Sequence, residues 1–304
     1  MPADTTTTTE PLGPVAQLTG EPVDELLTHA ALVIKIDNHE RARPQVGLNV
    51  ADIVYEEIVE GRITRFAAVF HSTASDPVGP VRSARTSDFD ILAGFNRPLF
   101  ANSGGNTTVL NLLRGVDAVN TNVNALPDLF YREESRSAPH NLMTETSELL
   151  VAKGDEGGVP PVFFEYRRNG EELPDEARAI NGIDLHYGGL NVSYDWDEEL
   201  GGWARSQEFS AHVDADGVQI APPNVIVQFI AYGRSSADAA SPEAIVVGEG
   251  EVWILVDGHI IEGQWSRSSA AEVTTYTLVD GTPIKLDPGR TWIALPRIGQ
   301  GTIR

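Results

Sequence analysis

A chain of 304 residues, 41% hydrophobic and 22% charged, has a globular composition and is long enough for two ordinary domains. With a formal net charge of −22 and no basic run, it would repel nucleic acids. The absence of cysteine excludes disulfides, thiolate metal sites and a cysteine nucleophile. No stretch approaches the roughly 18 apolar residues that span a bilayer.

The first 25 residues are predicted to form a flexible tether. They contain five acidic residues and no basic one, and residues 1–22 are rich in threonine, proline and glycine. Such a composition has little to bury. The alternative is an ordinary frayed terminus.

Residues 26–152 are predicted to form an N-terminal domain of mixed α/β structure, because strand-like apolar runs alternate with helical ones. A buried strand is expected over 30–36, and a hairpin over 53–60 and 63–71 turns at Glu60-Gly61-Arg62. Alternation places Glu56 on one face of the hairpin and Glu57 on the other. Further strands are expected at 98–103 and 118–123, and helices after Ser87, at 107–113 and near 148–152.

Residues 153–162 read KGDEGGVPPV, whose glycine, proline and acidic composition predicts a linker. Residues 163–304 follow as short alternating runs, with Asp-Gly turns at 216–217, 257–258 and 280–281. The fold class expected is therefore α+β: an N-terminal mixed sheet with helices, then a smaller, mainly antiparallel β domain.

The end of the first strand carries Asp37, Asn38 and His39. Ligands of open α/β sheets bind beyond the carboxyl ends of strands, so these side chains are candidates for a ligand shell or an acid/base pair. The structural alternative is an Asx-turn with His39 on the surface.

Two further segments have the chemistry of an anion site. Arg82 and Arg85 follow a Gly/Pro corner, and can present two guanidinium groups to an anion or instead bind internal acids. A glycine turn before the 107–113 helix can bring backbone amides close to the same anion, and could equally be an ordinary turn. Its candidate residues are Asn102, Ser103, Gly104 and Gly105. Ser83 lacks the G-x-S-x-G context of a catalytic serine.

The hairpin acids Glu56, Glu57 and Glu60 face Arg62 and Arg65. Such a pattern is typical of solvent-exposed charges that pair across neighbouring strands. The alternative, a glycosidase, would require two of these acids on opposite sides of a cleft.

The loop YREESRSAPHNL is too long for a plain connector, and places Arg132, Arg136, His140 and Asn141 as candidate ligand-binding residues, with His140 as donor or base. Its alternative is a surface excursion. The seven histidines show no H-x-x-x-H pair, so no metal and no cofactor are expected.

The C-terminal tryptophans have two interpretations. If several were exposed they would form a glycan-stacking surface, whereas tryptophan more often supplies core. They are Trp203, Trp253, Trp265 and Trp292.

Several separated motifs resemble the YerB-like lipoproteins, the DUF3048 family, whose activity is not established. They are D-N-H at 37–39, R-x-x-x-R-x-A-P-H-N-L at 132–142, N-V-I-V-Q at 224–228, G-x-W-x-R at 263–267 and P-G-R-T-W-I at 288–293. The resemblance spans roughly 30–298 and covers both domains of that family. It implies a secreted protein, anchored to the membrane only through a lipid on a cysteine upstream of the tether.

These observations favour a cell-surface, two-domain protein that binds a polar or anionic ligand in an N-terminal cleft. The partner would be a small ligand, a glycan or an envelope protein. A rival hypothesis is a hydrolase of an envelope glycan or phosphodiester with Asp37, His39 or Glu57 as acid/base. A third, a structural interaction module, would expose a large apolar patch instead.

Overall fold

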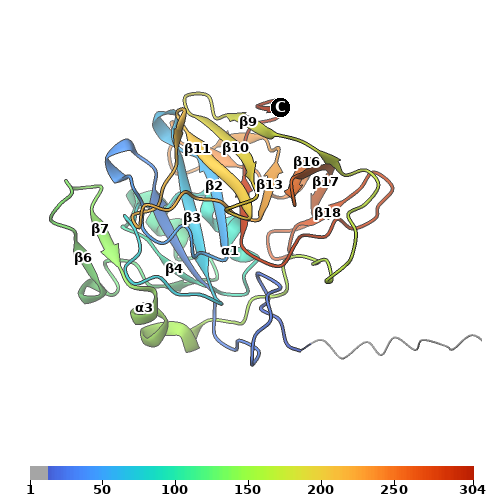
Figure 1. The fold of residues 1–304 in the computed structure, drawn as a ribbon. Coiled ribbons are helices and arrows are strands. Elements are labelled where there is room, and N and C mark those ends of the chain that lie inside the picture. The colour runs from blue at the N-terminus through green and yellow to red at the C-terminus, as the bar shows by residue number, and fades with distance from the viewer. Residues whose placement is uncertain (1–12) are drawn as a thin grey trace, which may run out of the picture.

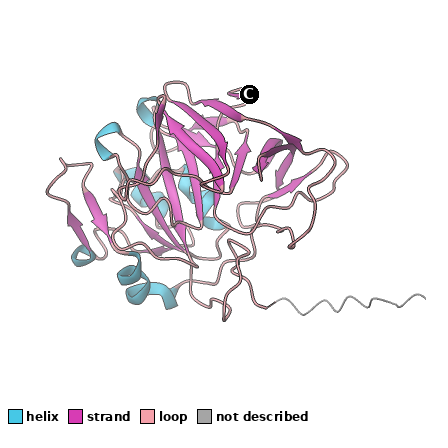
Figure 2. Ribbon diagram, in the orientation of Figure 1, coloured by secondary structure: helices cyan, strands magenta, loops and turns pink. Residues whose placement is uncertain are grey.

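The structure, a computed structural model, describes residues 13–304 as two stacked sheets with a few short helices (Figures 1 and 2). No helix within this part of the chain is long and apolar enough to cross a membrane. The strands of the large sheet are β1 (Leu32–Asp37), β2 (Ile53–Ile58), β3 (Thr64–Phe70), β4 (Leu99–Ala101), β5 (Val119–Asn120), β8 (Arg178–Ala179), β13 (Asn224–Gln228), β16 (Gly248–Val256), β17 (His259–Arg267), β18 (Thr275–Thr277) and β19 (Thr291–Ala294).

This 11-stranded sheet is mixed. Its order is β18-β17-β16-β13-β19-β2-β3-β1-β4-β5, with β8 also paired to β17. The β1, β2 and β3 strands pair antiparallel, while β4 and β5 extend the sheet in parallel from β1. On the other side β19 lies between β2 and β13 and is parallel to both. Strands from both halves of the chain therefore form one sheet.

The small sheet is antiparallel, with the order β12-β11-β10-β9-β20. Its strands are β9 (Gly182–His186), β10 (Asn191–Asp197), β11 (Gly202–Gln207), β12 (Ser210–Ala211) and β20 (Gly301–Ile303). Two separate ribbons pair β6 (Phe130–Arg132) with β7 (Leu142–Thr144) and β14 (Tyr232–Arg234) with β15 (Pro242–Ala244). The helices are α1 (Ser87–Ala93), α2 (Thr107–Leu113), α3 (Thr146–Lys153) and the 3-10 turns η1 (Glu40–Ala42), η2 (Glu60–Arg62), η3 (Pro127–Leu129) and η4 (Gly154–Glu156).

The expected fold class, α+β with a mixed N-terminal sheet and a mainly antiparallel C-terminal part, is confirmed. The Glu60-Gly61-Arg62 hairpin and the 107–113 helix are where the sequence predicts them. One detail differs: the helix expected after Ser87 begins at Ser87 itself, whose hydroxyl accepts the Ala244 N–H at 2.9 Å. The boundaries at 26–152, 153–162 and 163–304 stay predictions.

The tether prediction is wrong for residues 13–25 and lies outside the described residues for 1–12. Leu18 is fully buried, and its carbonyl oxygen accepts a hydrogen bond from the Tyr166 hydroxyl at 2.7 Å. The Thr19 carbonyl accepts the Gly289 N–H at 2.7 Å. Burial of Ala16 and Leu18, together with these hydrogen bonds, docks a segment whose overall composition is polar.

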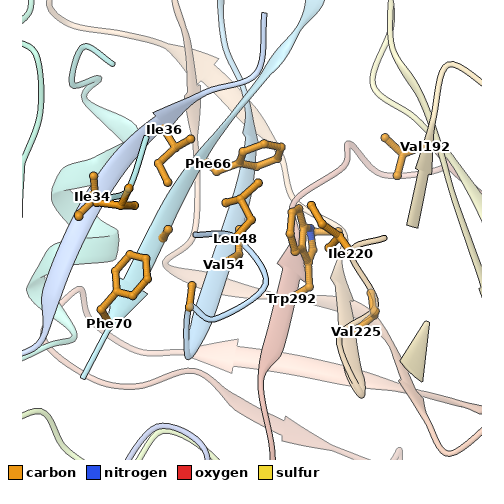
Figure 3. Close-up of a cluster of buried hydrophobic side chains, with 14 of the residues drawn as sticks. Ile34, Ile36, Leu48, Val54, Phe66, Phe70, Val192, Ile220, Val225 and Trp292 are labelled. Atoms are coloured by element: carbon orange, nitrogen blue, oxygen red, sulfur yellow. The ribbon is translucent and has the colours of Figure 1, made fainter. Parts of the chain in front are cut away.

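Two hydrophobic cores cover the two faces of the large sheet, because side chains alternate along its strands. One core lies between the sheets and combines Ile34, Phe66 and Trp292 of the large sheet with Val192 of the small one (Figure 3). The other joins Val33, Ala67 and Ile254 to α1 on the opposite face. The C-terminal tryptophans are all buried, so their role as core residues is confirmed and they form no glycan-stacking surface. They are Trp203, Trp253, Trp265 and Trp292.

A buried ion pair joins the two sheets. Arg205 of β11 donates through Nη2 to Glu56 Oε1 of β2 at 2.7 Å, and both side chains have 0% exposure. The remaining Glu56 oxygen accepts the Trp292 indole N–H at 3.1 Å, and the Arg205 guanidinium lies 5.0 Å from the centroid of a Trp292 ring. The pair is satisfied on both sides, as a buried pair must be.

We expect Arg205→Met to lower the free energy of unfolding by about 3–5 kcal/mol, because it leaves the Glu56 carboxylate buried without its partner. Arg178→Met is the matched control: Arg178 and Glu262 pair at the same 2.7 Å but are each half exposed. That control should cost at most about 1 kcal/mol. Urea unfolding measures both, and equal losses would contradict the assignment.

Two imidazoles are kept neutral by their surroundings. His71 donates through Nε2 to the His29 carbonyl oxygen at 3.1 Å. Burial, and then the neighbouring His29, lower the pKa of His71 from 6.5 to about 4. Burial, followed by the charges of Arg205 and Arg43, likewise lowers the pKa of His212 well below its usual range.

Stability should therefore fall on acidification. The unfolded chain binds these protons near pH 6.5, whereas folded His71 binds its proton only near pH 4, so the free energy of unfolding drops as the pH falls through that window. For His71 the loss is at most about 3 kcal/mol. His71→Gln, whose amide can still donate to the His29 carbonyl, should flatten this dependence in urea unfolding. His259→Gln, at a half-exposed position, should keep the wild-type slope, and identical slopes in both variants would contradict the role of His71.

Candidate functional site

One face of the large sheet concentrates charge near the carboxyl end of β1. Asp37 is opposite Arg65 of β3, which is in turn opposite Glu57 of β2, so all three point to the same face. Lys35, two residues before Asp37, shares this face. The sequence therefore brings Asp37 and Glu57, two acids of the hydrolase hypothesis, to the same side of the sheet.

Asp37 holds an imidazole and a guanidinium. Its Oδ2 accepts from His140 Nδ1 at 2.7 Å and lies 3.2 Å from Arg82 Nε, and its Oδ1 accepts the His39 backbone N–H at 3.1 Å. The His39 and His140 rings stack with centroids 4.3 Å apart. Residues predicted from three separate motifs thus meet around one carboxylate that is only 1% exposed.

The hydrogen bonds assign a tautomer to each ring. Because a carboxylate only accepts, His140 Nδ1 carries a proton, which leaves Nε2 as the basic nitrogen of the neutral ring. His39 Nδ1 accepts the Arg41 backbone N–H at 3.2 Å, so the neutral His39 ring carries its proton on Nε2. The two stacked rings are held in opposite tautomers.

A pocket of about 620 Å³ lies beside this cluster, and we call it the Arg65 pocket. Its walls come from the β2–β3 hairpin, the 82–85 loop and the turn before α2. The lining residues include His39, Glu60, Arg65, Ser83, Arg85, Gly105, Asn106 and Asp238. Three residues of the predicted ligand-binding set, His39, Arg85 and Gly105, line this pocket, whereas Arg82 does not.

Arg65 is the least compensated charge in the pocket. Its side chain reaches the Ser83 carbonyl oxygen through Nη1 at 3.1 Å, while its buried Nε has no hydrogen-bond partner among residues 13–304. Burial, and then the nearby Arg85 charge, lower the pKa of Arg65 to about 10, although Asp37 and Glu60 oppose the shift. Arg65 as a whole is only 6% exposed, and it lines the pocket.

Arg85, by contrast, has hydrogen-bond partners within the protein for all three of its side-chain nitrogens. It forms a two-point pair with Glu60, with Nε 2.7 Å from Oε1 and Nη2 2.8 Å from Oε2, and donates to the Ala84 carbonyl at 2.7 Å. Burial raises the pKa of Glu60, but hydrogen bonds from Arg85 and Ser241 outweigh it and bring the pKa to about 2. The structure therefore places Arg85 as an internal tie that borders the pocket.

Glu57 is also paired within the protein. Its Oε1 and the Asp88 Oδ1 share the Lys35 ammonium, the latter at 2.6 Å, and all three side chains are buried. Burial raises the pKa of Glu57, as does Asp88, while Lys35 lowers it. No pair of free carboxylates across a cleft, as a glycosidase would need, is present among Asp37, Glu57 and Glu60.

Asn38 points into the other face, toward the small sheet. Its Nδ2 donates to Thr64 Oγ1 at 2.8 Å and Gln207 Oε1 at 3.0 Å, and its Oδ1 accepts from Gln45 Nε2 at 3.1 Å. It is fully buried, so it is separated from the Asp37 cluster although it is the next residue. Strand alternation is the cause.

The glycine turn at residues 102–105 is hydrogen-bonded to the 82–85 loop. Ser103 N–H donates to the Arg82 carbonyl at 3.0 Å, and the Gly104 carbonyl accepts from Ala84 N–H at 2.9 Å. Asn102 is buried and its Oδ1 accepts the Gly104 N–H at 2.9 Å. Gly105 lines the pocket, but the Val109 amide of α2 is already bound by Asn106 Oδ1 at 2.8 Å. That amide of the first turn is therefore not free to bind an anion.

The four candidate residues of the 132–142 loop have different roles. Arg132 donates to Asn141 Oδ1 at 2.7 Å, and Asn141 Nδ2 donates to the Arg136 carbonyl at 3.1 Å, which holds the loop to itself. Arg136 ties the loop to η1 through the Ala42 carbonyl at 2.8 Å. Of these four candidates, only His140 contacts the Asp37 cluster.

Sequence reasoning left several lining residues of the pocket, Arg65 and Asp238 among them, out of the predicted ligand-binding set. For Arg65 the sequence favours a solvent-exposed cross-strand charge, although its register opposite Asp37 and Glu57 on buried strands makes it a buried guanidinium. Asp238 comes from a loop after β14 with no distinguishing pattern around it, so nothing local could have identified it.

Comparison with known proteins identifies the family. The N-terminal domain of the DUF3048 proteins of unknown function matches residues 18–158, and the C-terminal domain of the same family matches residues 183–293. The chain belongs to the DUF3048 family, as its motifs predicted.

A sequence match and a structural match, both to YerB of Bacillus subtilis, extend this assignment. The chain is 29% identical over 293 residues to the protein named "Putative lipoprotein YerB" of Bacillus subtilis (strain 168), covering 91% of this chain and 85% of that protein. It is also similar to the crystal structure of the YerB protein from Bacillus subtilis, with a TM-score of 0.83 and 25% identity over 96% of this chain and 99% of that one.

Proposed function

We propose that the protein is a lipid-anchored cell-surface protein that binds a polar ligand through an anionic group in the Arg65 pocket. The anchoring rests on its similarity to a protein named as a lipoprotein and on the Thr/Pro-rich composition of its first residues. The binding rests on the pocket itself.

The observation that supports binding is the uncompensated Arg65. Burying a guanidinium without a partner is costly, and proteins normally pair or fully hydrogen-bond such a group. A carboxylate or phosphate oxygen in the pocket would give Arg65 the ion-pair partner that it lacks among residues 13–304, where its side chain donates only to the Ser83 carbonyl oxygen. The cost of burying the charge is then offset when ligand binds.

The surroundings favour one anionic group over a polyanion. Glu60 and Asp238 also line the pocket, and the whole chain carries a net charge of −22. Ser83 and Asn106 add hydroxyl and amide groups that suit the polar remainder of a ligand. An acidic sugar, a peptide carboxylate and an acidic side chain of an envelope protein all offer this chemistry.

Arg65→Met tests the proposal. In buffer without multivalent anions it should be as stable as the wild type or more stable, because it removes a buried unpaired charge. Its affinity for phosphate or citrate, measured by calorimetric titration, should fall about 10- to 100-fold, because a hydrogen bond to a charged group is lost.

Arg114→Met, at an exposed position at the end of α2, removes the same charge outside the pocket and should keep wild-type affinity. If Arg65→Met bound both anions as the wild type does, Arg65 would not be the ligand-binding group.

A second candidate function, hydrolysis, is favoured by the Asp37–His140 pair. A buried carboxylate that fixes the Nδ1–H tautomer leaves Nε2 able to accept a proton from an attacking water. Neutral His39, which carries a donor Nε2–H, and Arg65 would hold developing negative charge. A phosphodiester is the substrate class that matches both the base and the anion preference.

His140→Gln should then reduce turnover of bis(p-nitrophenyl) phosphate by about 100-fold or more, because general-base catalysis contributes about 10²- to 10⁴-fold. Asp37→Asn should change the pH profile of the remaining rate, while His259→Gln should leave it unchanged. Absence of turnover by the wild type, or equal turnover by His140→Gln, would reject the hydrolase and leave the binding proposal standing.

A further inference from the structure

The turn between β11 and β12 holds an aromatic ring in solvent. Gln207 pairs with Ser210, so the turn consists of two residues, Glu208 and Phe209, with φ values of 50° and 64°. Such a turn is normally made by Asn-Gly, because a bulky residue at positive φ is strained. Phe209 is nevertheless there and is 90% exposed. An exposed phenyl ring on a strained turn contributes nothing to the core.

Hydrogen bonds fix this turn to the neighbouring hairpin. Glu208 N–H donates to the Asn191 carbonyl at 2.9 Å, and the Glu208 carboxylate accepts the Asn191 N–H at 2.6 Å. The Asn191 side chain accepts in turn from His186 Nδ1 at 2.7 Å. The ring is therefore presented by a braced turn rather than by a loose one.

Polar side chains cover the sheet surface next to the ring. Ser193 of β10 is opposite Asp184 of β9, which is opposite Thr302 of β20, so the three form a row on the solvent face. His186 and Asn191 form the next row. The hydrogen bond between them leaves the Asn191 amide N–H groups and His186 Nε2 uncommitted within residues 13–304.

Phe209 and both rows line a pocket of about 390 Å³, which we call the Phe209 pocket. Its volume lies in the range of small-ligand sites, and its lining mixes one aromatic face with hydroxyl, amide, carboxylate and imidazole groups. A pyranose matches this mixture, because its C–H face stacks on an aromatic ring while its hydroxyls both donate and accept hydrogen bonds.

We propose that the Phe209 pocket binds a pyranose unit of an oligosaccharide. The glycan-stacking role considered for the tryptophans falls instead to this phenylalanine, since those tryptophans are core residues. The proposal is independent of the Arg65 pocket, which shares no residue with it.

Titration of the full chain with chitotetraose, cellotetraose and maltotetraose, followed by amide NMR shifts, tests the proposal. At least one of these sugars should bind, with shifts at Asn191, Ser193 and Thr302. Phe209→Ala should weaken that binding at least ten-fold, and Phe209→Trp should retain it. Because the ring is 90% exposed and alanine keeps the Cβ at this positive-φ position, Phe209→Ala should melt near the wild-type temperature, so lost binding is not lost folding.

Tyr131→Ala removes a partly exposed aromatic ring from the β6–β7 ribbon and should leave sugar binding unchanged. Failure of all three sugars to bind, or equal binding by Phe209→Ala, would overturn the proposal. Self-association of the wild type that Phe209→Ala abolishes, without any sugar-induced shift, would overturn it as well and assign the ring to a protein contact.

Discussion

The ion pair between Glu56 and Arg205 is the interaction on which the arrangement of the sheets depends. Each sheet contributes one fully buried charge to this pair, and among residues 13–304 neither charge has another partner of opposite sign within hydrogen-bonding distance. Thr64 and Trp292 satisfy the carboxylate, and Gln207 and His212 contact the guanidinium. Shifting β2 by one residue would break this set at once, so the pair fixes the register of β2 against its neighbours.

The same register decides what the opposite face contains. With Glu56 turned toward the small sheet, Glu57 must turn away from it, and Arg65 and Asp37 follow on the paired strands. That face collects Lys35, Glu57 and Asp88 into a closed group, and Asp37, His140 and Arg82 into another. Arg65 lies between these two groups and, unlike Lys35 and Arg82, forms no ion pair among residues 13–304. A buried charge without an ion-pair partner is where a ligand has something to contribute.

Much of this was predictable from the sequence. The hairpin, its alternating acids, the Asp-Gly turns and the helix at 107–113 follow from local rules, and the motifs around Asp37, Arg82 and His140 lie near one another as expected. Partner choice was not predictable. Arg85 binds Glu60 and Arg65 does not, and only the three-dimensional path of the β2–β3 hairpin decides which arginine is paired. Likewise, Asn38 and Asp37 are adjacent in sequence yet face opposite cores.

The placement of β19 has a consequence for the order in which the protein folds. The indole of Trp292 on β19 reaches Glu56 across 236 positions of sequence, and β19 is the strand that covers the edge of β2. Until residues 291–294 are available, β2 presents an unpaired edge, the kind of surface that promotes misassociation. Folding must also wait for a contact of very long sequence separation, which slows it. A chain delivered progressively from its N-terminus would thus complete its central sheet late.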